Sequence, residues 1–592
     1  MNQVQAARRG APLREALLAA AIIAAVAWVH RREVVAFFGA DDLRLLQQAA
    51  GMSPPPVAVL RFLSRQFYFD GMLHLFGANP LPFHVAGLLV HLGCVAGLVA
   101  LARALRLPWH ASLLAGILFG CSPLAFASLL QAVTINDSLA LVCALAGVLC
   151  LLRGNRRASL AGVAFFWISP LLKESVVALP LIAYAVPRVS TGHGRAGTSR
   201  IDPWPALAAA VPLIFLVRVG LHRELLQGEA YALGGLGTIL SNFLAYTAWA
   251  TNIFDPLPDL VQDPTQRSLW TMGLYLGVVV LGAIVGKKHR SVMWMGVLWW
   301  VLGLAPVLAL AHHRYLTYTL VALPGLALVS ACALEALVGA VAARGESVLR
   351  SGPASRHLVA WSAAVVAVLF ALRSDHLIGQ RMQLRVPGTT MALDPYTRRE
   401  ETAAVAVSSF GAGVTSQLRQ AAVIDPPGNE RIVGAVSGQQ YRRASSPVAY
   451  NLLRAVTDDG RVFRVFFPTI DSVAWTRQWD PGLMDWDLFV VGADGRLFAA
   501  GRAPMAHEAI AETLLAQHLD AAARNYLAPI VATPRADPTL RWLYGVALLR
   551  NGAMDSAVAQ LQLIRAESPQ SPLGSEAERV LRTLPRGASN DH

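Results

Sequence analysis

Four short polar segments contain the residues of this sequence that could do chemistry. They separate long apolar runs and carry carboxylates, cations and imidazoles: Asp41-Asp42, Asn136-Asp137, Lys173-Glu174 and His312-His313-Arg314-Tyr315. A carboxylate can take a proton from an acceptor hydroxyl, while Arg, Lys and His can stabilise the negative charge that builds on a leaving phosphate. This combination of side chains is suited to group transfer from a phosphate-activated donor.

The composition limits the class of protein. The 592 residues are 55% hydrophobic and only 15% charged, against roughly 25% charged residues in ordinary soluble proteins. This excludes a purely soluble enzyme and indicates many membrane helices. The net charge of +13 comes from Lys and Arg scattered between the apolar runs, so we expect contact with membrane lipids and no nucleic-acid binding.

Apolar runs and basic clusters predict the membrane topology. The runs lie at 14–30, 81–102, 109–127, 138–152, 158–172, 174–186, 204–221, 238–254, 269–286, 291–311, 316–342 and 357–372. Basic residues mark the cytoplasmic side, and an even number of crossings must separate clusters on that side. The run 158–186 then forms a hairpin that turns at Lys173-Glu174, and the run 238–254 is re-entrant or interfacial. This leaves about eleven crossings.

The same parity places the polar segments on one outer face. The N-terminus is then cytoplasmic and the C-terminal part is external. Ionisable groups at membrane depth tend to line a wet cavity, although Asp41-Asp42 could be a solvated loop and Lys173-Glu174 an ion pair at a helix end. His312-His313-Arg314 could anchor a helix start, and His84 could simply pack inside a helix bundle. The Ala, Arg and Leu richness is typical of a bacterium, which makes this outer face periplasmic or extracytoplasmic.

The sequence past Arg373 predicts an external soluble part. The expected division is a membrane domain at 1–372, a domain with short strands at 373–505, helical repeats at 506–585 and a tail at 586–592. Strands are expected at 461–467, 486–491 and 496–500, the last two as a hairpin. A 34-residue period, which aligns Ala523 with Ala557 and Leu527 with Leu561, indicates tetratricopeptide repeats that hold a protein or glycan partner.

The five cysteines predict no metal or disulfide site. Each lies inside an apolar run, with no Cys-x-x-Cys spacing, which favours a packing role. The few carboxylates near the polar segments also favour a reaction without a metal or other cofactor.

The order of the polar segments resembles that of a known family, the GT-C membrane glycosyltransferases. The likeness is strongest to the transmembrane, tetratricopeptide-repeat-bearing O-mannosyltransferases and their bacterial relatives, and covers about residues 14–345. The residues that carry it are Phe38 to Asp42, Arg61-Phe62-Leu63, Leu75 to Pro80, Phe83-His84, Leu88 to His91, Ser122-Pro123, Asp137, Leu172 to Ser175, Pro180, Arg314 to Leu316 and Tyr318.

The resemblance implies an inverting transferase that moves a sugar from a polyprenyl-phosphate donor to an external hydroxyl acceptor on a protein or glycan. It implies Asp41 as the base, with Asp42 assisting. Arg314 would hold the lipid phosphate, with Lys173 and His313 as further contacts. The remaining residues that it implies would support these side chains or contact the acceptor: Asp137, Glu174, Tyr315 and His84.

Two other functional classes remain open from the sequence. The first is a lipid-linked oligosaccharide O-ligase or polymerase, which also combines about a dozen spans with an external domain. Such enzymes usually depend on a very large external loop, whereas the longest one expected here, at 222–268, is modest. The second is a non-enzymatic membrane scaffold whose repeats recruit a partner.

Overall fold

The chain forms two compact units, Met1–Arg398 and Arg399–His592. The computed structural model describes residues 17–53, 61–153, 155–184, 232–260, 265–349, 354–387, 390–424, 447–477, 481–483, 485–492, 495–533 and 536–584. The apolar run expected at 204–221 and the tail expected at 586–592 lie outside these residues.

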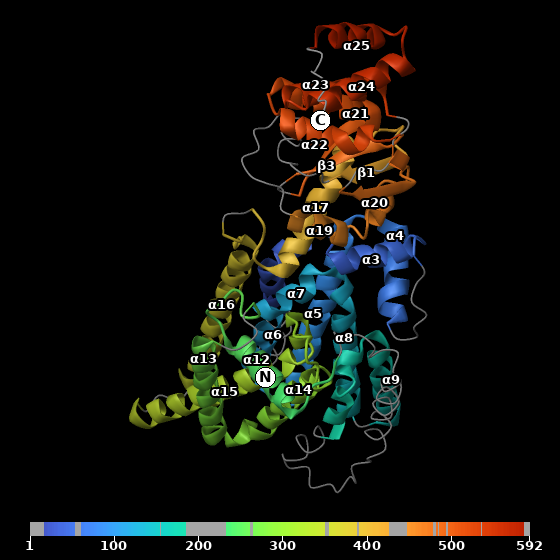
Figure 1. Ribbon diagram of the computed structural model, residues 1–592. Coiled ribbons are helices and arrows are strands. Elements are labelled where there is room, and N and C mark those ends of the chain that lie inside the picture. The colour runs from blue at the N-terminus through green and yellow to red at the C-terminus, as the bar shows by residue number, and fades with distance from the viewer. Residues whose placement is uncertain are drawn as a thin grey trace. The chain divides into compact units, whose positions relative to one another are not determined.

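The first unit is a bundle of apolar helices (Figure 1). Its α-helices are α2 Arg31–Val34, α3 Ala40–Ala49, α4 Tyr68–Phe76, α5 Pro80–Ala104, α6 Trp109–Gly120, α7 Phe126–Leu130, α8 Ile135–Leu152, α9 Arg156–Leu172, α12 Leu236–Thr251, α13 Gln266–Val285, α14 Arg290–Leu308, α15 Leu323–Leu349 and α16 Ala354–Gln383. Shorter segments are the π-helix η1 Phe62–Phe67 and the 3-10 helices η2 Pro123–Ala125, η3 Ala132–Thr134, η4 Glu174–Val176, η5 Leu179–Tyr184, η7 Lys287–His289 and η8 Leu316–Thr319.

The chain is a helical membrane protein. Within the described residues, 7 helices are long and apolar enough to cross a bilayer: Pro80–Ala104, Trp109–Leu130, Ala132–Leu152, Gln266–Val285, Lys287–Leu308, Leu323–Arg344 and His357–Gln383. Each overlaps an apolar run of the sequence. Apolar spans form helices because a helix satisfies all its backbone hydrogen bonds inside the segment and can therefore exist in lipid. A shorter apolar helix, Leu17–Val29, precedes α2.

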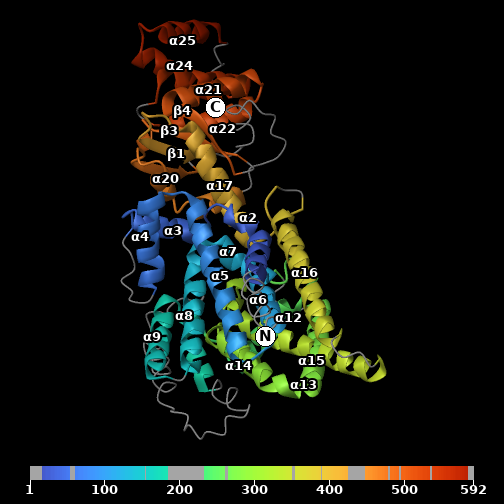
Figure 2. The same ribbon diagram turned by 180° about the vertical axis from the view of Figure 1, so that it is seen from behind.

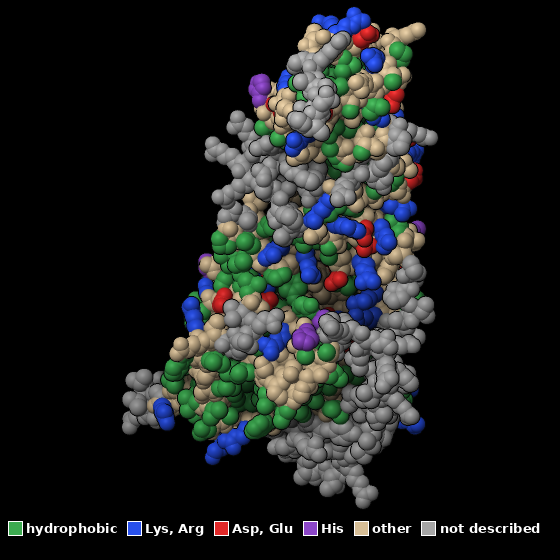
Figure 3. Space-filling model, in the orientation of Figure 1, with side chains coloured by type: hydrophobic (Ala, Val, Ile, Leu, Met, Phe, Trp, Pro, Cys, Tyr) green, Lys and Arg blue, Asp and Glu red, His purple; other side chains and the backbone are tan. Residues whose placement is uncertain are grey.

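The outside of this unit is apolar as well as its core. Trp270, Leu274, Trp294 and Trp361 are all exposed, and Figure 3 shows hydrophobic side chains spread over the surface around α13 and α15, with Lys and Arg at the margins. Water does not favour so much exposed apolar surface, whereas lipid does.

The segment after α9 differs from the expected helical hairpin. α9 ends at Leu172, and residues 174–184 form η4 and η5 in place of a second α-helix. Pro180 contributes to this difference, since it has no backbone N–H and disfavours the α conformation in the residue before it. The polar pair Lys173-Glu174 therefore lies at a change of backbone geometry.

Helix α16 continues well past the composition change at residue 372. It ends at Gln383. Two sets of ion pairs hold its polar end against other parts of the first unit. Asp375 accepts hydrogen bonds from Arg31 and Arg32, and Arg381 donates to Asp259 and Asp394. These contacts tie residues up to Asp394 to the helices of the first unit, which ends at Arg398.

The second unit contains a four-stranded sheet with strand order β2-β1-β3-β4. The strands are β1 Gln420–Ile424, β2 Ser472–Thr476, β3 Asp487–Val491 and β4 Leu497–Arg502. β1 is parallel to β2 and β3, while β3 and β4 are antiparallel, with Val491 opposite Leu497. The hairpin expected at 486–500 is thus confirmed.

The expected strand at 461–467 is wrong, because these residues form helix α20, Arg461–Phe466. Gly460 precedes it in the left-handed conformation (φ 86°), which glycine adopts without strain. The apolar residues also fit a helical period, and Phe463 stacks on Phe410 with ring centroids 4.1 Å apart. Other helices of this unit are α17 Pro395–Gly413, which begins before the unit boundary, and α19 Pro447–Val456.

Five helices follow the sheet, as the pattern from residue 506 predicts. They are α21 Ala503–Ala516, α22 Asp520–Val531, α23 Pro538–Arg550, α24 Met554–Glu567 and α25 Pro572–Thr583. Consecutive helices pack against each other, and α21 also covers β3 and β4. Gly545 of α23 lies opposite Leu561 of α24, and a Cβ at this position would lie 3.6 Å from Leu561 Cδ2.

Candidate functional site

Asp41 and Asp42 stand at the first turn of α3, but their side chains lie in different environments. Asp42 is fully buried. Its Oδ2 accepts from Gly39 N at 2.9 Å and its Oδ1 from Val133 N at 2.6 Å. Asp41 is exposed. Of the two carboxylates, Asp41 is therefore the one accessible to a substrate, and Asp42 fixes the start of α3 to η3.

Burial dominates the electrostatics of Asp42. It raises the pKa of this carboxyl from its ordinary value to about 7, against the opposing effect of the backbone N–H groups of Val133 and Gly39, which stabilise the anion. The hydrogen bond to η3 places α3 beside the N-terminal end of α8 (Figures 1 and 2). Asp137 follows on the first turn of α8.

His84 supports the loop that leads to Asp41. It is buried on α5, with Nε2 3.2 Å from Phe37 O and Nδ1 3.3 Å from Leu129 O. It thus links α5 to the segment before α3 and to α7. Its contacts are those of a residue that positions the loop.

Lys173, Asp137 and Ser175 form a buried polar group. Lys173 Nζ lies 3.3 Å from Asp137 Oδ2, and Ser175 Oγ donates to Asp137 Oδ1 at 3.0 Å. The side chain of Asp137 is 2% exposed and that of Lys173 12%. Lys173 lies at the break between α9 and η4, where the backbone is extended (φ −158°, ψ 129°).

Arg61, which directly precedes η1, and Arg65 within η1 extend this group. Arg61 Nε donates to Glu174 Oε2 at 2.7 Å, and Arg61 N donates to Leu171 O at 2.6 Å. Ser64 Oγ donates to Leu172 O at 2.8 Å, which fastens η1 to the end of α9. The charges of Arg61 and Arg65 also act on Lys173.

The group carries an excess of positive charge. Three cations, Arg61, Arg65 and Lys173, face the two carboxylates of Asp137 and Glu174. Burial, together with the charges of both arginines, lowers the pKa of Lys173 to about 8, while Asp137 opposes this shift. We name these five residues the basic cluster. Its chemistry suits a phosphate or another anion.

Arg314 is held by α12. Its guanidinium donates to Asn242 Oδ1 through Nε and to Ser241 Oγ at 2.9 Å through Nη2. Asn242 is itself fixed, because its Nδ2 donates to Leu308 O and Leu310 O. The polar residue that interrupts the run 238–254 therefore orients a cation.

His313 and Tyr315 form an aromatic group next to Arg314. The rings of His313 and Tyr315 meet edge-on with centroids 4.6 Å apart, and Tyr318 lies 5.9 Å from Tyr315 by the same measure. Tyr315 is 42% exposed. The segment continues into η8, which packs against η2 and α7.

The predicted residues thus fall into two neighbourhoods. Asp41, Asp42, Asp137, Lys173 and Glu174 lie around η1, η3 and the start of α8. Arg314, His313 and Tyr315 lie around α12 and η8. In the described part of the chain, no group of three or more His, Cys, Asp or Glu residues could hold a metal ion.

Several residues of these neighbourhoods do not stand out in the sequence. They are Arg61 and Arg65 as cations, Ser175 as the partner of Asp137, and Ser241 and Asn242 as partners of Arg314. The spacing of four residues between Arg61 and Arg65 in the sequence is a signal that could have pointed to a common basic neighbourhood. The other partners come from segments distant in sequence.

Comparison with known proteins leaves the family as a resemblance only. No protein-family model matches this chain, and no curated protein is significantly similar to it.

Proposed function

We propose that this protein is a membrane glycosyltransferase that moves a sugar from a polyprenyl-phosphate donor to a hydroxyl acceptor, a protein or a glycan, with inversion at the anomeric carbon. The observation that carries the proposal is the basic cluster. Three cations outnumber two carboxylates at one end of apolar helices, where a lipid-linked phosphate could reach them from the bilayer.

The proposed reaction has one displacement step. Asp41 takes the proton of the acceptor hydroxyl, and the acceptor oxygen attacks the anomeric carbon. The bond from that carbon to the phosphate oxygen breaks, and the polyprenyl phosphate leaves with the electron pair. Lys173, Arg61 and Arg65 stabilise the departing charge, while Asp42 and His84 hold the loop that carries Asp41.

Arg314 supplies a further contact for the donor in this proposal. Its guanidinium is oriented by Ser241 and Asn242, and such preorganisation reduces the cost of ordering the side chain when an anion binds. His313 and Tyr315 present ring surfaces beside it, which suit a sugar or the first prenyl unit of the lipid.

The proposal also includes the number of membrane spans and the side of the membrane on which each end lies. The N-terminus lies in the cytoplasm, about eleven segments cross the membrane, and the second unit lies outside the bacterial cytoplasmic membrane. The helices α21 to α25 are proposed as tetratricopeptide-like repeats. Support comes from the packing of each of these helices against the next and from the full burial of the small residue Ala557 on α24.

The experiment is donor consumption by the purified full chain in lipid. Radiolabelled polyprenyl-phosphate sugars are supplied, and both transfer and slow hydrolysis are scored. Wild-type protein should consume one donor class, and Asp41→Asn should lose that activity while remaining folded. Asp70→Asn, which changes an exposed carboxylate on the adjacent helix α4, is the matched control and should behave like the wild type.

Two results would contradict the proposal. Undiminished consumption by Asp41→Asn would remove the proposed base. No consumption of any donor by folded protein would favour the ligase or the scaffold, and the ligase would be recognised by its use of lipid-linked oligosaccharides. A second unit that alone captured a partner and restored the phenotype of a deletion would favour the scaffold.

A further inference from the structure

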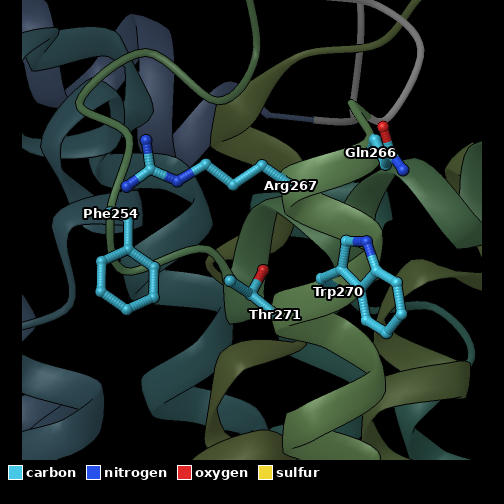
Figure 4. A pocket seen from close by; sticks show the side chains of 5 residues that line it. All are labelled: Phe254, Gln266, Arg267, Trp270 and Thr271. Atoms are coloured by element: carbon cyan, nitrogen blue, oxygen red, sulfur yellow. The ribbon is translucent and has the colours of Figure 1, made fainter.

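A pocket of about 510 Å³ opens beside the first turn of α13. Its lining combines aromatic, polar and cationic side chains: Phe254, Gln266, Arg267, Trp270 and Thr271. Figure 4 shows the side chain of Arg267 reaching back over Phe254, with Trp270 on the other side of Thr271. The pocket is separate from the basic cluster and from the partners of Arg314.

A hydrogen-bond network fixes the wall that carries Phe254. Asn252 Nδ2 donates to Ser268 Oγ at 3.0 Å, and Phe254 N donates to Asn252 Oδ1 at 3.1 Å. Ser268 also contacts Thr265, whose Oγ1 caps the start of α13. Asn252 and Ser268 are both buried. An exposed aromatic ring is thus held on a rigid support.

Two guanidinium groups make the surroundings of Phe254 positive. Arg267 lies over the ring, with Cζ 5.4 Å from its centroid. Arg373 of α16 donates to Ile253 O at 2.9 Å and Phe254 O at 3.0 Å. The adjacent carboxylate, Asp255, accepts from Leu257 N through Oδ1. The two cations outnumber this single carboxylate.

The pocket adjoins a surface that faces lipid. α13 is the least buried of the candidate membrane spans in the described residues. Below the pocket, Leu274, Val278 and Leu281 continue the exposed face that begins with Trp270, at spacings of three or four residues. Trp and Arg at the end of an apolar span are typical of the membrane–water interface.

We propose that this pocket binds the headgroup of an anionic membrane phospholipid. Arg267 contacts the phosphate, Gln266 and Thr271 offer hydrogen bonds to the polar part, and Phe254 and Trp270 flank the glycerol region. The acyl chains follow the exposed face of α13. The inference rests on charge complementarity and on the position of the pocket at the end of a lipid-facing helix, and it does not depend on the proposed transferase activity.

The test is retention of phosphatidylglycerol by the full chain. The protein is reconstituted in nanodiscs of phosphatidylcholine with phosphatidylglycerol, and bound lipid is counted by native mass spectrometry after release. Arg267→Ala should raise the apparent dissociation constant for phosphatidylglycerol about tenfold, the loss of one charged hydrogen-bonding contact, and Arg267→Lys should retain part of the affinity. Arg290→Ala, which removes an exposed arginine at the start of α14 that donates to Ala283 O near the far end of α13, is the matched control and should retain the lipid.

A second measurement locates the bound lipid. A photoreactive benzoylphenylalanine is placed at position 266. It should form an adduct with phosphatidylglycerol when Arg267 is retained, and the yield of the adduct should fall strongly when Arg267→Ala is also present. Inorganic phosphate should not compete with the adduct.

Three outcomes would overturn the inference. Equal loss of lipid in Arg267→Ala and Arg290→Ala would mean that phosphatidylglycerol is attracted by the overall surface charge and not by this pocket. Equal retention of phosphatidylcholine would remove the selectivity for an anionic headgroup. Displacement of phosphatidylglycerol by equimolar polyprenyl phosphate would identify the pocket as a donor site.

Discussion

Lys173 and Asp137 form an ion pair across two helical segments, with Nζ and Oδ2 3.3 Å apart and both side chains largely buried. The pair joins the end of α9 to the first turn of α8. It also brings together two of the four polar segments that the sequence separates by 36 positions (173 − 137).

Breaking this pair should cost more stability than removing it. Asp137→Leu leaves a cation buried without its carboxylate, and Lys173→Met leaves the carboxylate, so each should lower the free energy of unfolding by about 3 kcal/mol. The double variant should recover most of this loss. Thermal unfolding in one detergent checks the prediction, and additive losses in the double variant would contradict it.

Donor affinity should depend on the protonation of Lys173. Burial and the two arginines lower its pKa to about 8, so the ammonium form is present at neutral pH and is lost as the pH rises through 8. The donor phosphodiester keeps its charge over this range. We therefore expect the dissociation constant of the donor to rise by up to about tenfold per pH unit above this pKa.

Lys173→Arg provides the control for this pH effect. A guanidinium stays protonated throughout this range, so the affinity of this variant should be independent of pH between 7 and about 9.5. A wild-type affinity that does not change across the same range would show that Lys173 does not hold the donor.

Asp42 should make the protein less stable as the pH rises, which is the opposite of the effect of a carboxylate whose pKa is lowered by folding. Its pKa is raised to about 7, so the folded state binds this proton more tightly than the unfolded state. The contribution is complete below the ordinary pKa of an aspartate and is lost as the pH rises toward about 7. The difference in melting temperature between wild type and Asp42→Asn should therefore shrink from pH 5 to pH 7.5.

The asparagine variant should also be less stable at pH 5. At pH 5 the protonated carboxyl still turns two oxygens with lone pairs toward the backbone N–H groups of Gly39 and Val133, whereas the amide nitrogen of asparagine has no lone pair to accept either bond. A difference that grows with pH would contradict the raised pKa.

The orientation of Arg314 should depend on α12. Ser241→Ala removes the partner of Nη2 and should reduce kcat/KM for the donor about fivefold, equivalent to about 1 kcal/mol. Thr251→Ala is the matched control on the same helix, since its hydroxyl bonds only to the carbonyls of Thr247 and Ala248 among the contacts described. Equal effects of the two variants would mean that Ser241 acts through helix stability alone.

Close packing of α14 against α15 should depend on Gly296. A Cβ at this position would lie 2.7 Å from Gly325 O, so Gly296→Leu should destabilise the protein by about 2 kcal/mol or more. Gly273 of α13 has open space around it, and Gly273→Leu should leave the melting temperature nearly unchanged. Similar melting temperatures for both variants would contradict the close approach.

The hairpin of β3 and β4 and the long apolar helices follow from local pattern. Alternating apolar residues predict the strands, and apolar runs of about 20 residues predict the spans, because backbone polar groups in lipid must be satisfied within the segment. The same local reading fails at Arg461–Phe466, where stacking of Phe463 on Phe410 favours a helix. It also fails at residues 174–184, which form 3-10 helices.

Residue type and local periodicity are enough to establish that the chain enters the membrane and which segments carry ionisable side chains. The partners of those side chains, in contrast, depend on how the helices pack in three dimensions. Asp42 bonds to Val133, Lys173 pairs with Asp137, and Arg314 bonds to Asn242. Each contact joins residues far apart in the chain, and no local pattern encodes it, because a buried charge takes whichever partner the packing of other helices brings within reach.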